Sequence, residues 1–202
     1  MTRIKMCGLS GCGDIEAANS IMPEYIGFVF AQKSKRYVSP GMASRLRKKL
    51  SPDITAIGVF VNENVETVAG LLKDDIIDIA QLHGNESDEY IRRLRELTDK
   101  PLIQAFKIEN YQTILRAEQS IADMILLDSG TGSGKTFDWG LLDNIKRPYF
   151  LAGGLDQKNV FSAVKRLHPF AVDVSSGIET DGIKDKIKMA AFAAEVRKED
   201  GI

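Results

Sequence analysis

The sequence lacks the features of membrane, secreted and nucleic-acid-binding proteins. No apolar run approaches the roughly 20 residues that a membrane-spanning helix needs. The first ten residues, MTRIKMCGLS, contain no apolar stretch of the kind found in signal peptides. The 27 basic residues are balanced by 28 acidic ones, so the net charge is −1 and no basic field favours a polyanion. We therefore expect a cytoplasmic protein whose partners include neither a membrane nor a nucleic acid.

Cysteine and histidine are also scarce, with two residues of each type. Cys7 and Cys12 have neither the spacing nor the cysteine- and histidine-rich surroundings of a metal site. A disulfide between them would be unusual in a reducing cytosol, so we expect free thiols. No Ser-His-Asp arrangement stands out either, and nucleophilic hydrolysis is therefore not favoured.

What the sequence does contain is an alternation of short apolar runs with amphipathic segments, repeated eight times. The runs predict strands at residues 3–9, 25–30, 54–61, 76–82, 102–108, 124–127, 149–152 and 170–174. The segments between them predict helices at 14–20, 40–50, 65–72, from Ser87 through Leu97, through Ile114 and Leu115, around 141–145, around 160–167, and at 184–198. The first is expected to be capped near Gly13 or Asp14 and the third by Asn62 or Asn64. In the second, Met42, Leu46 and Leu50 fall on one face. Eight strand-helix units in 202 residues are the count of a small (β/α)8 barrel, whereas an open doubly wound sheet usually has fewer strands. We predict an α/β protein with one domain, a (β/α)8 TIM barrel over residues 1–202.

The sixth apolar run ends on Asp128 and leads directly into the glycine-rich segment SGTGSGKT at 129–136. A carboxylate at the end of a buried parallel strand is typical of an active site, and glycines can bring backbone N–H groups close to an anion. The segment also resembles the phosphate-binding loop of nucleotide hydrolases. That motif requires glycine where Ser129 stands and a helix directly after the lysine, whereas Phe137 and Asp138 intervene, with Asp138 the expected cap of a later helix. A nucleotide hydrolase and a simple solvent loop both stay open as alternatives.

Polar and glycine residues follow most of the other predicted strands. In a (β/α)8 barrel these positions form the active face. They are Cys7-Gly8, Ser34-Lys35-Arg36, His83-Gly84, Asp128, Gly153-Gly154 and the segment Asp173, Val174, Ser175, Ser176, Gly177. The last two are small, donor-rich loops after strands 7 and 8, where this fold commonly binds phosphate. They predict a phosphate ester as the substrate.

Alternation along the first strand places Lys5 and Cys7 on the face opposite Ile4 and Met6, so Cys7 should look into the barrel. A thiol there can accept a proton if a nearby positive charge favours the thiolate. Asp128 would face it from the sixth strand, and such a pair suggests proton relocation rather than hydrolysis.

The remaining candidates are less distinctive. His83 on the rim suits either a substrate-orienting role or a hydrogen-bonded structural one. His168, before Pro169, belongs at the opposite end, and Cys12 is expected to be structural or exposed.

Seven segments together resemble the phosphoribosylanthranilate isomerase family of tryptophan biosynthesis. They are KMCGL at 5–9, SKR at 34–36 after Phe30, QLHG at 81–84, LDS at 127–129, GKTFDW at 134–139, LAGGL at 151–155 and VDVSSGIE at 172–179. The match runs in order from the first strand to the last helix. Met6 and Lys35 depart from the residues more usual in the family, without touching the expected chemistry.

The resemblance implies an Amadori rearrangement of N-(5-phosphoribosyl)anthranilate to 1-(2-carboxyphenylamino)-1-deoxyribulose 5-phosphate, with no cofactor and no metal. It implies that Asp128 protonates the ribose ring oxygen and that Cys7 removes the proton from C2. It also implies that Arg36 meets the anthranilate carboxylate and that the glycine and serine loops hold the phosphate. The expected substrate-binding residues are Arg36, His83, Gly153, Gly154, Asp173, Ser175, Ser176 and Gly177.

Two further alternatives remain within the barrel class. A related isomerase acting on another aminosugar phosphate, as in histidine biosynthesis, would favour paired aspartates, whereas the first strand here ends in Cys7. A binding module without activity would leave no reason for an acid and a thiol to face each other. A monomer and a homodimer both fit the sequence.

Overall fold

The computed structural model describes residues 1–129, 139–142 and 145–198, and the structural statements below concern these residues. The predicted loop from Gly130 to Lys135 and the expected helix cap Asp138 lie outside them.

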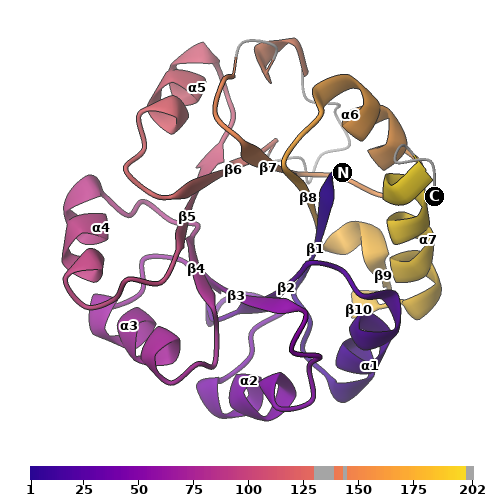
Figure 1. The fold of residues 1–202 in the computed structure, drawn as a ribbon, viewed down its shortest axis with the longest axis horizontal. Coiled ribbons are helices and arrows are strands. Elements are labelled where there is room, and N and C mark those ends of the chain that lie inside the picture. The colour runs from indigo at the N-terminus through magenta and orange to yellow at the C-terminus, as the bar shows by residue number, and fades with distance from the viewer. Residues whose placement is uncertain (130–138, 143–144, 199–202) are drawn as a thin grey trace.

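Eight parallel strands close into a barrel, as predicted. They are β1 (Arg3–Cys7), β2 (Tyr25–Val29), β3 (Thr55–Phe60), β4 (Ile79–Leu82), β5 (Leu102–Lys107), β6 (Met124–Asp128), β7 (Tyr149–Ala152) and β8 (Ala171–Val174). Each strand pairs with the next along the chain, and β8 pairs with β1 in a register that sets Lys5 beside Asp173. Figure 1 looks down this ring, with the helices arranged around its outside.

The helices around the ring are short and mostly capped by side chains. They are α1 (Cys12–Ile21), α2 (Pro40–Arg47), α3 (Val65–Lys73), α4 (Asp88–Arg95), α5 (Tyr111–Glu118), the 3₁₀ helix η1 (Trp139–Leu142), α6 (Val160–Leu167) and α7 (Lys186–Arg197). Within the described part of the chain, none is long and apolar enough to cross a membrane.

Two layers of apolar side chains hold the barrel together. Outward-facing residues such as Ile4 and Met6 pack beneath the helices, while the interior is filled by Ile57, Leu126, Phe150 and their neighbours. Both faces of most strands are therefore buried, which explains why these strands read as continuous apolar runs. The packed interior closes the barrel below and leaves its carboxyl end for the loops.

The predicted start of α1 was wrong, whereas one of the two caps predicted for α3 is confirmed; side-chain hydrogen bonds explain both outcomes. The cap of α1 is Gly11 instead of Gly13 or Asp14, because the Asp14 carboxylate accepts hydrogen bonds from the N–H groups of Ser10 and Gly11, one turn back. Asn64, and not Asn62, caps α3 by accepting from two backbone N–H groups. The cap Ser87 on α4 is confirmed.

The apolar faces of α2 and α4 were also predicted too long. Met42 is exposed, while Leu50 and Leu97 lie beyond the ends of their helices. Of the predicted apolar face of α2, Leu46 is the residue buried within the helix. These two helices end before the last residues of the apolar pattern from which they were predicted.

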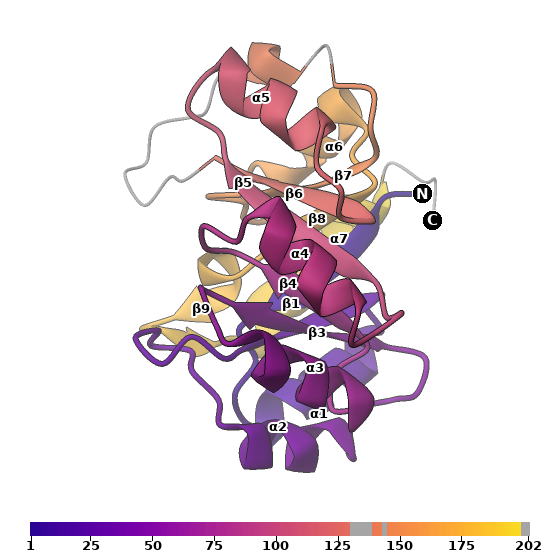
Figure 2. The ribbon, with the colours of Figure 1, turned by 90° about the vertical axis from the view of Figure 1, so that its left-hand side faces the viewer.

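The segment after β8 differs most from the prediction. A 3₁₀ turn, η2 (Ser176–Ile178), leads into a small antiparallel hairpin of β9 (Glu179–Thr180) and β10 (Ile183–Lys184). Lys184 therefore belongs to the hairpin, and the last helix starts at Lys186 with Asp185 as its cap. Figure 2 shows this hairpin at the end of the barrel away from the N-terminus.

Candidate active site

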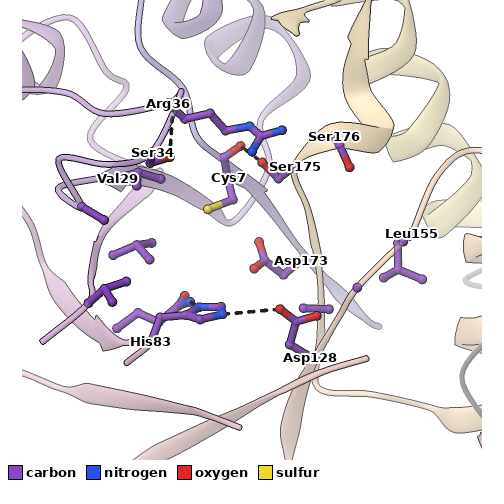
Figure 3. Close-up of a pocket in the computed structure, with 17 residues that line it drawn as sticks. Cys7, Val29, Ser34, Arg36, His83, Asp128, Leu155, Asp173, Ser175 and Ser176 are labelled. Atoms are coloured by element: carbon purple, nitrogen blue, oxygen red, sulfur yellow. Dashed lines mark hydrogen bonds and ion pairs between the residues drawn. The ribbon is translucent and has the colours of Figure 1, made fainter. Parts of the chain in front are cut away.

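A cavity of about 470 Å³ opens at the carboxyl ends of the strands. It is lined by Cys7, Val29, Ala31, Ser34, Arg36, Val59, Val61, Gln81, His83, Asp128, Ala152, Gly153, Gly154, Leu155, Asp173, Ser175 and Ser176. The structure thus brings together every predicted site residue except Gly177. That glycine packs against the loop after β7, where a Cβ would lie 2.0 Å from the Leu155 carbonyl oxygen. Figure 3 shows side chains from several strand ends converging on the cavity.

Cys7 ends β1 and points into the barrel, as the strand alternation predicted. Its side chain packs with Val29 and Val59 and is 8% exposed. Burial raises the pKa of the thiol, while the positive charges of Lys5 and Lys184 act in the opposite direction. The balance between apolar packing and nearby cations therefore sets how readily the thiolate forms.

Lys5 lies two residues earlier on the same face of β1 and is fully buried. Its ammonium donates a hydrogen bond of 2.9 Å to the Asp173 carboxylate across the β1–β8 seam. Burial disfavours the charged form, but the Asp173 carboxylate and the Cys7 sulfur raise the pKa of Lys5 above its usual value. Asp173, predicted as substrate-binding, lines the cavity and is also the counter-ion of this lysine.

Asp128 ends β6 across the cavity from Cys7, and a chain of polar side chains leads away from it (Figure 3). The His83 Nε2 atom lies 3.4 Å from its Oδ2 atom. On its other side, the imidazole Nδ1 is 2.7 Å from the Gln81 amide nitrogen. In the tautomer protonated on Nε2, the ring accepts from the Gln81 amide at Nδ1 and directs its own N–H at Asp128. His83 is thus both hydrogen-bonded and directed at the carboxylate.

The glycines after β7 are needed because the chain passes so close to Asp128. Gly153 has a φ of 98°, and a Cβ on it would lie 2.0 Å from the Ser129 hydroxyl and 2.7 Å from an Asp128 carboxylate oxygen. Gly154 also has a positive φ, 63°. Glycine adopts such conformations without steric cost, so this loop can follow the cavity wall closely.

On the opposite wall, Arg36 is held by a residue that the sequence reasoning did not single out. Its Nε and Nη2 atoms donate to the two carboxylate oxygens of Glu179, at 2.6 and 2.7 Å. Lys184 donates to the same carboxylate at 2.6 Å and to the Ser175 carbonyl oxygen at 2.8 Å. Glu179 stands within the family-like segment VDVSSGIE, but nothing local indicates its partner.

The other candidates lie elsewhere. Cys12 is exposed, and His168 ends α6 beside Pro169 at the other end of the barrel. Within residues 1–129, 139–142 and 145–198, no group of three or more His, Cys, Asp and Glu side chains is arranged to hold a metal ion.

Comparisons with known proteins agree with one another. A family model described as N-(5'-phosphoribosyl)anthranilate (PRA) isomerase matches residues 4–195. The N-(5'-phosphoribosyl)anthranilate isomerase of Endomicrobium trichonymphae is 42% identical over 191 residues, 94% of this chain and 95% of that protein. Two crystal structures of phosphoribosyl anthranilate isomerase superpose along 98% of this chain and 100% of theirs. The structure of the Thermotoga maritima enzyme has a TM-score of 0.90 and a sequence identity of 37%. The structure of a complex with reduced 1-(o-carboxyphenylamino)-1-deoxyribulose 5-phosphate has a TM-score of 0.88 and a sequence identity of 36%.

Proposed function

Since the chain belongs to the N-(5'-phosphoribosyl)anthranilate isomerase family of tryptophan biosynthesis, we propose that it performs the Amadori rearrangement of that substrate with Asp128 as general acid and Cys7 as general base. The observation that carries this proposal is the placement of a carboxyl group and a thiol on opposite sides of one cavity (Figure 3). The cavity is also bounded by the small loops after β7 and β8, which suit a phosphate.

The reaction divides into two proton transfers that involve Asp128 and Cys7, followed by tautomerisation of the enolamine to the ketone. Asp128 gives its proton to the ribose ring oxygen as the C1–O bond breaks, and the anilino nitrogen lone pair forms a C1=N Schiff base. The Cys7 thiolate then takes the proton from C2, and the electrons of that C–H bond move toward nitrogen to give an enolamine. Loss of the C2 hydroxyl proton and protonation at C1 yield the ketone. Atoms and electrons balance, because substrate and product are isomers.

The surrounding residues divide the binding between them. Arg36 meets the anthranilate carboxylate, since a guanidinium matches a carboxylate in charge and geometry. Gly153, Gly154, Ser175 and Ser176 hold the phosphate, with Gly177 shaping the loop from behind. His83 orients Asp128, and Asp173 contacts the sugar. This assignment needs no cofactor and no metal.

Ionisation of the Cys7 thiol should make the catalytic rate depend on pH. Burial raises the pKa of Cys7, so the active thiolate accumulates only as the pH rises toward that value. We expect kcat/KM to increase with pH on its acidic limb as the thiol ionises. Cys7→Ser should remove this limb together with the activity.

The direct test is turnover of freshly prepared N-(5-phosphoribosyl)anthranilate with a chelator present, followed by loss of substrate fluorescence. Cys7→Ser and Asp128→Asn should each slow turnover by roughly 10²- to 10⁴-fold, the usual contribution of a general acid or base. Cys12→Ser is the matched control and should keep the wild-type rate, because that thiol is exposed and away from the cavity.

The outcomes distinguish an error in the role of one residue from an error in the proposed reaction. A Cys7→Ser or Asp128→Asn variant that keeps full rate removes that residue from its role. Arg36→Ala should mainly raise KM, and an unchanged KM contradicts carboxylate binding by Arg36. A folded wild-type protein without any turnover refutes the proposed reaction, and nucleotide binding by the segment at 129–136 would then be tested next.

A further inference from the structure

The Arg36 guanidinium is held along one of its edges. Glu179 accepts from Nε at 2.6 Å and from Nη2 at 2.7 Å, so both carboxylate oxygens are used in a fork-to-fork pair. The Glu179 side chain is 7% exposed and that of Arg36 is 32% exposed, so the carboxylate is buried while part of the guanidinium stays accessible. Of the five guanidinium N–H groups, two are committed to Glu179.

The remaining three N–H groups belong to the other end of the guanidinium. Nη1 makes no hydrogen bond to another described residue. Arg36 lines the cavity, and its side chain extends over Cys7 toward Ser175 (Figure 3). A carboxylate in the cavity can therefore be met end-on, by Nη1 and the free hydrogen of Nη2.

The stem of Arg36 is constrained as well. It passes over Gly8, whose φ is 79° and where a Cβ would lie 2.4 Å from the arginine Cδ. The stem is packed at Gly8 and the head is anchored at Glu179, so the side chain is fixed at two points. An arginine held in this way loses less conformational freedom when a ligand binds.

Lys184 explains how Glu179 can hold Arg36 without cancelling its charge. It faces Glu179 across the β9–β10 pair and donates to the same carboxylate at 2.6 Å. Burial lowers the pKa of Lys184, and the Glu179 carboxylate acts in the opposite direction. With Lys184 protonated, two cations and one carboxylate leave the cluster with a net positive charge. Burial opposes ionisation of Glu179, yet hydrogen bonds from Arg36 and Lys184 lower its pKa below the usual value, so the carboxylate is ionised.

We propose that Glu179 is a positioning residue that fixes Arg36 for end-on recognition of the substrate carboxylate, with Lys184 keeping the cluster cationic. The inference rests on the proposed function, in which Arg36 meets that carboxylate. It makes the hairpin after β8 part of substrate selection. A purely structural role would instead tie the hairpin to the barrel and affect all ligands alike.

The test compares two stable ligands that differ in one group: reduced 1-(2-carboxyphenylamino)-1-deoxyribulose 5-phosphate and its phenylamino analogue without the carboxylate. Calorimetric titration gives the ratio of their affinities for each variant. Wild type should prefer the carboxylated ligand roughly 10- to 100-fold, as expected for hydrogen bonds to a charged group. Arg36→Ala should abolish the preference.

Glu179→Gln should lower the preference at least fivefold while affinity for the analogue changes less than about twofold, and KM should rise with kcat retained. Glu179→Asp keeps the charge and withdraws the carboxylate by one methylene. It should lower the preference too, and it serves if the glutamine variant does not fold. Glu195→Gln is the matched control, because it breaks a surface ion pair with Lys198 and should change neither affinity.

A wild-type preference in both folded Glu179 variants overturns the inference, as does an equal loss of affinity for the two ligands. If Arg36→Ala keeps the preference, the carboxylate is recognised elsewhere, and both the role of Arg36 and this inference fail. If wild type binds neither ligand, the proposed function itself fails.

Discussion

Replacing Lys5 with methionine removes the ammonium beneath Cys7 and keeps an unbranched side chain of similar length. The pair it breaks is short and fully enclosed, with 2.9 Å between Nζ and the Asp173 Oδ1 atom and exposures of 0% and 9%. Asp173 then remains as a carboxylate without its counter-ion. The substitution therefore tests both the energy of the pair and its effect on the thiol.

Breaking a buried ion pair by removing one partner typically costs about 3–5 kcal/mol, because a charge is left without compensation. For a chain of this size, each kcal/mol lowers the melting temperature by roughly 2–4 °C. We therefore expect Lys5→Met to melt about 6–20 °C below wild type. The double variant Lys5→Met/Asp173→Asn should recover part of that loss, since no uncompensated charge remains.

The same change should act on Cys7. The positive charge of Lys5 is the largest influence that lowers the thiol pKa against burial, so its removal raises that pKa further. The thiolate reacts with iodoacetamide and the thiol does not. In a Cys12→Ser background, where Cys7 is the one remaining cysteine, alkylation should be slower at neutral pH and its pH profile should shift upward.

Two results would refute this reasoning. A folded Lys5→Met protein whose Cys7 titrates as in wild type shows that the lysine does not act on the thiol. A melting temperature within about 2 °C of wild type shows that the pair contributes little. Lys5→Arg is the rescue variant, because it restores a cation, and its alkylation profile should lie nearer to wild type.

Three further predictions concern the cavity wall, the core and a helix end. Gly153→Ala should lower kcat at least tenfold, because the new methyl group collides with Ser129 and Asp128. An unchanged kcat contradicts that close approach. Phe150→Ala, inside the barrel and fully buried, should cost about 3–5 kcal/mol in a urea titration. Asn64→Ala should cost about 1 kcal/mol by removing the cap of α3, and no change in the urea midpoint would show that the cap is dispensable.

The barrel could be predicted because its signal is repeated in every unit. Strands buried on both faces read as apolar runs, and eight of them with helices between leave few alternatives. Helix ends were less predictable, since Asn62 and Asn64 are equivalent by residue type. The distinction lies in backbone geometry, because Asn64 is extended as a cap requires, while Asn62 has a φ of 50°.

The positions of the candidate site residues could be predicted where a single strand end places them, but not where two segments distant in sequence meet. Cys7 and Asp128 follow from their positions at strand ends. The pair of Arg36 and Glu179 joins residues 143 apart in sequence, and no local sequence pattern predicts such a contact. Lys184 was assigned to the last helix because its neighbours have helical composition, whereas the hairpin register and its bond to Glu179 decide its place.

The seam between β1 and β8 has a kinetic consequence. The Lys5–Asp173 bond and the bond from the Ser175 hydroxyl to the Cys7 carbonyl each join residues 168 apart, among the last contacts that a growing or refolding chain can make. Cys7, Lys5 and the loop after β8 therefore come together when the ring closes. Recovery of catalytic rate after dilution from denaturant should lag behind recovery of helical circular dichroism, and the interval between them measures how long the barrel stays open.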